Sequence, residues 1–234
     1  MKLEGKHILL TGGSLGIGKM TAKKLVQKGS KVVITGRSME RLKVASEFSG
    51  AIPFKFDLSD LDSISDNAQH CLSLLGGKID VLINNAGVGS FDALDHISKD
   101  QFYEVFNTNV FGLALLTKEI IPLMKKQQSG SIINIGSSAS VKGFSNGSVY
   151  SASKFAVRAL TQCWQSELRP FNIRVCQLNP SEVTTAFYNQ ERKEREPLTN
   201  KLSPEEIAHS ILSVLEMEDK GFITELNIWA TNPF

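Results

Sequence analysis

Short apolar runs alternate with longer amphipathic stretches along almost the whole chain of 234 residues. The runs at residues 7–11 and 31–35 show the pattern clearly, because each is rich in aliphatic or β-branched residues and ends at glycine. Strands that alternate with helices form β-α-β units, and such units build a parallel sheet with helices on both faces. The chain is therefore predicted to adopt an α/β fold with a doubly wound parallel sheet.

The same pattern predicts the individual elements and their order. Seven strands are expected at residues 7–11, 31–35, 51–56, 79–84, 131–137, 172–178 and 222–230. Helices are expected at residues 16–29, 38–49, 59–75, 100–126, 148–169 and 204–216. Ser38 and Ser203 stand where helix N-caps are expected. No repeat or linker divides the pattern, so residues 1–234 are expected to form a single domain.

Composition and charge exclude several classes of protein. Lys and Arg number 26 and Asp and Glu number 24, and the net charge of +2 argues against a surface that binds nucleic acid. The three cysteines lack C-x-x-C spacing and the four histidines are dispersed, so neither a disulfide scaffold nor a metal site is expected. No stretch has the pattern of a signal peptide or a membrane span, so we expect a cytoplasmic protein that does not enter the membrane.

A glycine-rich turn, TGGSLGIG at residues 11–18, connects the first expected strand to the first expected helix. Glycines allow a tight turn and a close approach to a pyrophosphate, and the helix N-terminus offers free N–H groups to the anion. In this strand-turn-helix context the motif predicts dinucleotide binding, whereas the alternative is a purely structural turn. The contacts predicted from this turn are Gly12, Ser14, Leu15, Gly16, Ile17 and Gly18.

The end of the second expected strand indicates which nicotinamide cofactor binds. An acidic residue there bonds the ribose hydroxyls of NAD, whereas this chain has Arg37 and Ser38, whose guanidinium and hydroxyl groups suit a 2′-phosphate. NADP(H) is therefore favoured over NAD(H), unless Arg37 is only a solvated surface charge. Asp57 and Leu58 follow the third expected strand and are predicted to line the adenine pocket, although Asp57 could instead cap a turn.

Four polar residues form the candidate catalytic set. Tyr150 and Lys154 lie four residues apart on an expected helix, where an ammonium group would favour the phenolate and lower the tyrosine pKa. Ser137 ends the fifth expected strand, at the sheet edge where ligands bind. Asn109 lies in the middle of a long expected helix, where asparagine has poor propensity. Without further context, the first two could be a surface pair and Asn109 a buried amide in a local hydrogen-bond network.

Together these residues resemble the short-chain dehydrogenase/reductase family over essentially the whole chain. The resemblance rests on the glycine-rich turn, on NNAG at residues 84–87, on NPSEVTT at residues 179–185, and on Asn109, Ser137, Tyr150 and Lys154 in matching order and spacing. Ser181 stands where the family has glycine, which is expected to alter the local backbone. The resemblance implies a Rossmann-type sheet in the order 3-2-1-4-5-6-7.

The resemblance also implies a role for each residue. Tyr150 exchanges a proton with the substrate oxygen, and Lys154 lowers the pKa of Tyr150 and holds the nicotinamide ribose. Ser137 stabilises charge on the substrate oxygen, and Asn109 orders a water beside Lys154. Hydride passes to or from the nicotinamide, so no metal is needed. The further cofactor contacts that the resemblance implies are Asn85, Ala86, Gly87, Pro180, Val183 and Thr185, besides Tyr150 and Lys154.

The resulting prediction is an NADP-dependent oxidoreductase that moves a hydride between the nicotinamide and a small carbonyl or secondary-alcohol substrate. Two alternatives stay open. One is a 3-oxoacyl-thioester (acyl-carrier-protein) reductase, against which the sequence of residues 222–233 argues weakly. The other is a non-catalytic NADP-binding regulatory or scaffold protein, against which the intact set of four residues argues.

Two segments bear on the substrate and on assembly. Residues 186–202 are aromatic at 187 and 188 and polar at 189–196, which predicts a mobile lid over the substrate, although the polar run alone is typical of a solvated helix face. This lid, the loop at 138–147 and Phe91 are expected to set the substrate. The helix expected at 100–126 is apolar nearly all round, so a homo-oligomer is predicted, a tetramer by family resemblance or else a dimer.

Overall fold

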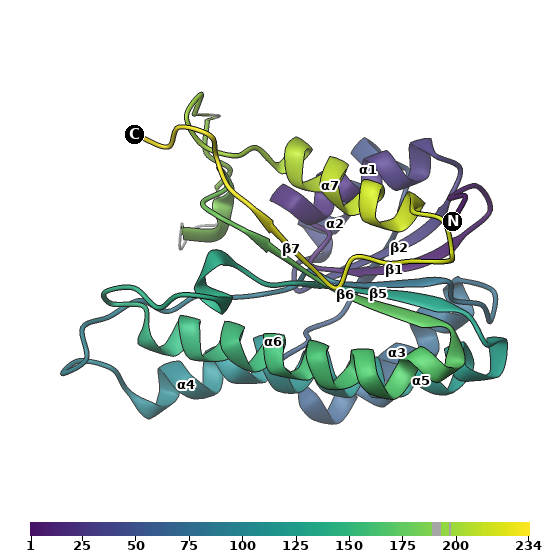
Figure 1. Ribbon diagram of the computed structural model, residues 1–234, viewed down its shortest axis with the longest axis horizontal. Helices are drawn as coiled ribbons and strands as arrows, with labels where there is room; N and C mark the ends of the chain where they lie inside the picture. Colours follow the sequence, from purple (N-terminus) through teal and green to yellow (C-terminus); the bar gives the residue numbers. More distant parts are fainter. Residues whose placement is uncertain (189–192, 197) are drawn as a thin grey trace.

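The computed structural model describes residues 1–188, 193–196 and 198–234. Seven parallel strands form one sheet in the order β3-β2-β1-β4-β5-β6-β7, and helices cover both of its faces (Figure 1). The predicted fold class and strand order are therefore confirmed. The strands are β1 (His7–Thr11), β2 (Lys31–Gly36), β3 (Ile52–Lys55), β4 (Val81–Asn84), β5 (Gly130–Ile135), β6 (Ile173–Pro180) and β7 (Glu225–Ile228).

The helices form two layers. In Figure 1, α1, α2 and α7 lie on one side of the sheet, and α3, α4, α5 and α6 lie on the other. The bounds are α1 (Gly16–Gln27), α2 (Met39–Ser49), α3 (Ile64–Leu74), α4 (Lys99–Phe106), α5 (Leu113–Gln127), α6 (Ser148–Leu168) and α7 (Pro204–Glu216). Ser38 and Ser203 are the N-caps of α2 and α7, as predicted, and each accepts a hydrogen bond from a backbone N–H of its helix.

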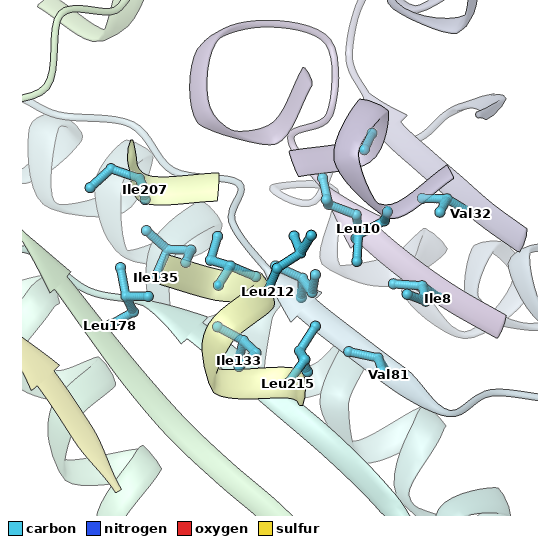
Figure 2. Packing of buried hydrophobic residues seen from close by; sticks show 14 of the residues in the cluster. Ile8, Leu10, Val32, Val81, Ile133, Ile135, Leu178, Ile207, Leu212 and Leu215 are labelled. Carbon is cyan, nitrogen blue, oxygen red and sulfur yellow. The ribbon is translucent and has the colours of Figure 1, made fainter. Parts of the chain in front are cut away.

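Alternation along the strands sends side chains to both layers of the core. In β1, Ile8 and Leu10 belong to the core under α1 and α7, whereas Leu9 belongs to the core under α3 and α5. Figure 2 shows Leu212 and Leu215 of α7 packed over the first of these cores. Because both faces are buried, the strands read as continuous apolar runs, which is typical of parallel sheets.

Several strand bounds differ from the predicted ones. Strand β4 begins two residues later than predicted, and β5 ends at Ile135, so Ser137 lies just after this strand and caps a 3-10 turn. Strand β6 continues to Pro180, two residues further than predicted, because the ladder with β7 pairs Pro180 with Ile228. Strand β7 is shorter than the predicted run at 222–230. The longer β6 carries residues 179 and 180 to the edge where the cavity lies.

The prediction of one continuous helix at 100–126 is wrong. Helix α4 is followed by a π-helical segment, Asn107–Gly112, and only then by α5. A Cβ at Gly112 would lie 2.0 Å from the Leu58 carbonyl oxygen, so the segment packs directly against the backbone that follows β3. The wider turn also brings Asn109 toward the loop after β4, which is a use that π-helical segments often have at functional sites.

The helix predicted at 59–75 is also shorter than expected. A 3-10 turn, Leu61–Ser63, precedes α3. Asp57 causes this delayed start, since its Oδ1 accepts hydrogen bonds from the backbone N–H and the hydroxyl of Ser59, at 3.0 and 2.7 Å. The alternative interpretation of Asp57 as a turn-capping residue is thus correct.

Candidate cofactor and active site

A cavity follows the carboxyl ends of the parallel strands, across the point between β1 and β4 where the strand order reverses. Its walls include nearly all of the residues predicted to bind a cofactor, together with Ser137, Tyr150 and Lys154. Two predicted residues, Gly18 and Asn109, do not line it. The fold therefore brings together most of a candidate site that the sequence spreads over residues 12–185.

The glycine-rich turn is packed so closely that side chains cannot be added to it. Gly12 has a φ of +67°, and a Cβ there would lie 2.8 Å from the Cα of Ala86. A Cβ at Gly18 would lie 2.2 Å from the Gly12 carbonyl oxygen. Gly18 thus lets α1 approach the turn instead of lining the cavity. The turn forms a cradle open to a ligand on one side, which fits the pyrophosphate of a dinucleotide.

Hydrogen bonds join this turn to the loop after β4. The Thr11 hydroxyl accepts from the backbone N–H groups of Asn85 and Ala86, at 3.1 and 3.0 Å. The Asn85 side-chain amide donates to the carbonyl oxygens of Thr11 and Gly12, at 3.0 and 2.9 Å. The two backbone segments that line this end of the cavity are therefore fixed to each other.

A carboxylate from the polar run occupies the N-terminus of α1. The Gly16 N–H donates to Glu194 Oε1 at 3.2 Å, and Lys19 Nζ lies 3.6 Å from Glu194 Oε2. Residues 193–196 are exposed and not helical, so the interpretation as a solvated helix face does not hold for them; residues 189–192 lie outside the described residues. The contact shows that this helix end attracts an anion. Sequence reasoning missed both Glu194 and Lys19, and no local signal pointed to Glu194.

Two arginines line the cavity at the end of β2. Arg37 follows Gly36 directly, and Arg41 stands one helical turn later in α2. The Ser38 hydroxyl accepts a hydrogen bond from the Arg41 N–H at 3.3 Å, which fixes the start of the helix. Sequence reasoning found Arg37 and missed Arg41, because Arg37 precedes the helix and no helical spacing relates the two residues.

Tyr150 and Lys154 lie at the start of α6, and both are buried. Lys154 Nζ donates to the Ile135 carbonyl oxygen at 2.8 Å and lies 5.8 Å from the centre of the Tyr150 ring. Burial lowers the pKa of the Lys154 ammonium group to about 8. The interpretation of the two residues as a surface pair is therefore wrong.

Ser137 is held by its backbone at the carboxyl end of β5. Its N–H donates to Ser140 Oγ at 3.1 Å and to Asn179 Oδ1 at 3.3 Å, and its hydroxyl accepts from the Ala139 N–H. Asn179 is fully buried, and its Oδ1 also accepts from the Gln177 side chain at 2.8 Å. Sequence reasoning did not single out Asn179 as a supporting residue, although a polar side chain in a buried strand was a signal.

Asn109 is a buried amide that connects two elements. Its Oδ1 accepts from the Val88 N–H at 2.9 Å, while its Nδ2 donates to the Val88 carbonyl at 2.9 Å and to Ser153 Oγ at 3.0 Å. A Cβ at Gly87 would lie 3.3 Å from Asn109 Oδ1 and 3.7 Å from Lys154 Nζ. The local hydrogen-bond network considered for Asn109 is present, next to Lys154. The role of ordering a water stays a prediction.

The segment after β6 closes the cavity beside the glycine-rich turn. A Cβ at Gly16 would lie 3.0 Å from the Thr185 side chain, so Thr185 contacts the turn. Ser181 has no positive φ, its N–H donates to the Ile228 carbonyl at 2.8 Å, and its hydroxyl accepts from the Ala230 N–H at 3.4 Å. Serine is therefore accommodated without strain where the family has glycine.

Two aromatic side chains contact Tyr150 at the other end of the cavity: Phe187, which lines the cavity, and Phe91, which does not line it. The ring centre of Tyr150 lies 5.3 Å from that of Phe91 and 5.5 Å from that of Phe187. In the part of the chain that the structure describes, no group of three or more His, Cys, Asp and Glu side chains could hold a metal ion. Among the same residues, no helix is long and apolar enough to cross a membrane.

Comparison with known proteins identifies the family. The model of the short chain dehydrogenases matches residues 6–196. A 3-oxoacyl-(acyl-carrier-protein) reductase of Thermotoga maritima is 33% identical over 236 residues, covering 96% of this chain and 95% of that protein. An NADP-dependent 3-hydroxy acid dehydrogenase of Schizosaccharomyces pombe is 31% identical over 250 residues, covering 99% and 95%. The solved structure of an alcohol dehydrogenase from Thermococcus sibiricus with 5-hydroxy-NADP has a TM-score of 0.86 and 28% identity, covering 97% of each chain. The chain belongs to the short-chain dehydrogenase family.

Proposed function

We propose that this NAD(P)-dependent oxidoreductase of CH–OH groups uses NADP(H) to interconvert a small carbonyl compound and its secondary alcohol, with Tyr150 as the proton donor and acceptor. The observation that carries the proposal is the buried pair of Tyr150 and Lys154 in one cavity with the glycine-rich turn. A pure binding protein would need the turn but not this pair. Residues 1–234 are proposed to act as one domain.

The residues present fit a dinucleotide. Gly12 and Gly16 and the N–H groups at the start of α1 would hold the pyrophosphate, because the glycines place no Cβ in that cradle. The pyrophosphate would then replace the Glu194 carboxylate at the Gly16 N–H. Arg37 and Arg41 would bind a 2′-phosphate, and among the described residues that line the cavity at the end of β2, none is a carboxylate that would prefer the ribose hydroxyls of NAD. The nicotinamide supplies or accepts the hydride. Lys154 and residues 180–185 would hold that half of the cofactor.

The proton moves at the Tyr150 hydroxyl. A positively charged Lys154 beside the ring stabilises the phenolate, so that Tyr150 can both give and take a proton near neutral pH. The Ser137 hydroxyl would donate a hydrogen bond to the substrate oxygen and stabilise the charge that develops there. Asn179 and Ser140 hold the Ser137 backbone, which fixes the direction of that donor.

Tyr150→Phe tests the proposal, because it removes one oxygen and leaves the packing of the ring intact. Turnover of a panel of ketones, aldehydes and 3-oxo esters with NADPH should fall by about 10²–10⁴-fold, which is the usual contribution of positioned acid–base catalysis. The dissociation constant for NADPH should stay unchanged. Turnover close to that of the unmodified protein, with hydride transfer shown to limit the rate, would exclude Tyr150 as the acid–base group.

A second candidate is the reduction of a 3-oxoacyl thioester on acyl carrier protein. The relative from Thermotoga maritima favours it, since it carries that activity in its name and matches nearly the whole chain. The two candidates are separated by the carrier. If a 3-oxoacyl group is reduced much faster on acyl carrier protein than on a short thiol such as N-acetylcysteamine, the carrier is part of the substrate.

We also propose that the chain forms a homo-oligomer through α4 and α5, as a tetramer or a dimer. In the single chain, Phe102 and Tyr103 are exposed on α4, Tyr103 to 62%, and Leu115 is exposed on α5. Phe111, which is 45% exposed, lies on the π-helical segment between the two helices. A partner chain would remove this apolar surface from water. Light scattering at micromolar concentration should give a multiple of the 25.7 kDa subunit mass. The mass of one subunit would refute the proposal.

A further inference from the structure

We propose that Phe91 and Phe187 act as an aromatic clamp that selects neutral carbonyl substrates with a flat apolar substituent and rejects substrates that carry a carboxylate there. This inference rests on the proposed function, because it concerns the substrate that reaches Tyr150. It goes further by naming the chemical class of the substrate and two residues that determine it.

The two rings enclose Tyr150 from different parts of the chain. Phe91 comes from the loop after β4 and Phe187 from the 3-10 turn Ala186–Tyr188 after β6. Both are tilted against the Tyr150 ring, with interplanar angles of 59° and 56°. Tyr150 is only 7% exposed as a result. A substrate oxygen at the Tyr150 hydroxyl therefore brings its neighbouring atoms close to Phe187 in the cavity wall, and a flat substituent would reach Phe91 on the same Tyr150 ring.

Gly89 brings the two rings together. A Cβ at this position would lie 2.7 Å from the Phe91 ring and 2.9 Å from the Phe187 ring, so both rings cover the same piece of backbone. Phe144 continues the apolar surface outward, with its ring centre 6.0 Å from that of Phe91 and half of its area exposed. The aromatic surface thus runs from the reacting group to the solvent, and flat apolar groups pack well against such surfaces.

The distribution of charge around the cavity points the same way. Among the described residues that line it, the charged ones are Arg37, Arg41, Asp57 and Lys154. The first three lie at the far end, by β2 and β3, and Lys154 is bonded to the Ile135 carbonyl beneath the site. A carboxylate held against the Phe91 and Phe187 rings would lose its water, which is unfavourable. Among these lining residues the cation near Tyr150 is Lys154, which is buried and already donates to the Ile135 carbonyl.

The test compares two substrates that differ in one charge. Methyl benzoylformate and benzoylformate have the same flat ring and the same ketone, and the charge of the acid lies next to that ketone. We expect kcat/KM with NADPH to be at least about tenfold higher for the ester, since an unpaired buried charge costs more than the 1.4 kcal/mol that a tenfold change represents. Binding of both compounds to the enzyme–NADPH complex, measured by calorimetry, should show the same order.

Variants connect the selectivity to the two rings. Phe91→Ala and Phe187→Ala should each lower kcat/KM for the ester by about tenfold, while butane-2,3-dione, which is too small to span both rings, should lose less than about threefold. Phe222→Ala is the matched control, since this ring packs on Arg169 before β7, away from the cavity, and should change neither value. An unchanged NADPH dissociation constant shows that a variant is folded.

The outcomes separate the two proposals. If the ester binds more tightly than the acid but neither it nor any other carbonyl compound is reduced, the proposed function fails and the clamp stands. If the acid binds and reacts as well as the ester, or if the two variants treat the ester and butane-2,3-dione alike, the clamp is refuted while the proposed function stands.

Discussion

The two ends of the cavity are built in different ways. At the cofactor end, two backbone segments lie in close contact: Gly12 lies against Ala86, and the Thr11 hydroxyl and the Asn85 amide each bond to the backbone of the opposite segment. At the substrate end, Phe91 and Phe187 enclose Tyr150 with side chains alone. The first end depends on where side chains are absent, and the second on which side chains are present. The substrate end can therefore change by substitution in its loops without disturbing the cofactor end.

Lys154 lies in the cavity beside Tyr150, and we expect its burial to have the largest effect on the free energy of unfolding. Its pKa is about 8 in the folded protein against an ordinary 10.5, so between these values the unfolded chain holds a proton that the folded chain has lost. The free energy of unfolding should therefore rise with pH across this window, by up to about 3 kcal/mol. Below pH 8 this gain is absent, because both states carry the proton.

Urea unfolding of the protein and of Lys154→Met, without cofactor, measures this difference. The unmodified protein should gain stability relative to the variant between pH 8 and pH 10.5. Other groups titrate in both proteins and cancel in the comparison. Two curves that stay parallel across the window would mean that Lys154 is not buried as a charge.

Arg37→Ala probes the cofactor end alone. It should weaken NADPH binding by ~1.5–3 kcal/mol, the loss of a charged hydrogen bond, and leave NADH binding nearly unchanged. Arg41→Ala should act in the same direction, because Arg41 lines the same part of the cavity. Arg169→Ala, which removes a guanidinium that stacks on Phe222, serves as the control. Binding of both cofactors is measured by nucleotide fluorescence. If Arg37→Ala weakens the binding of NADPH and NADH equally, the assignment of a 2′-phosphate site is contradicted.

Glu194→Gln should have the smallest effect, which is on the affinity for NADPH at the cofactor end. Its carboxylate occupies the N–H group of Gly16 that a pyrophosphate would use, so it competes with the cofactor. Removal of the charge should tighten NADPH binding by about two- to fivefold, as expected for a charge at a helix N-terminus. Glu196→Gln, a neighbouring exposed carboxylate, should leave the affinity unchanged. Weaker binding by Glu194→Gln would mean that Glu194 supports the cofactor site instead.

Hydrogen exchange on the same variant tests the lid predicted at residues 186–202, of which residues 189–192 and 197 lie outside the described residues. Leu202 at the end of this segment is bonded to the backbone just before its start, since the Thr184 N–H donates to the Leu202 carbonyl at 2.8 Å. We expect slow exchange only when cofactor and substrate are both bound, and faster exchange in free Glu194→Gln than in the free unmodified protein. Strong protection of the segment in both free proteins would indicate a fixed structural element.

The sequence by itself determined the fold class, the glycine-rich turn, the position of Arg37 after the second strand and the pairing of Tyr150 with Lys154. These features are written in local spacing: apolar period, glycine positions, and residues four apart on one helix. Even the strand order followed from motifs that the family resemblance carries. Apart from the strand order, which only the resemblance implied, such features are predictable because each is fixed by residues that are neighbours along the chain.

Only the tertiary structure decided which distant side chains meet. Asn109 reaches Val88 because a π-helical segment interrupts the expected helix, and the Asn179 side chain reaches the backbone of Ser137 because β6 pairs beside β5. Phe91 and Phe187 contact the same Tyr150 ring because the loop after β4 and the turn after β6 pack together at Gly89. The contact of Glu194 with the start of α1 joins residues far apart in sequence, and no local pattern predicts it. The physical reason is that periodicity encodes which face of an element is buried, whereas loop conformation depends on packing between elements far apart in sequence.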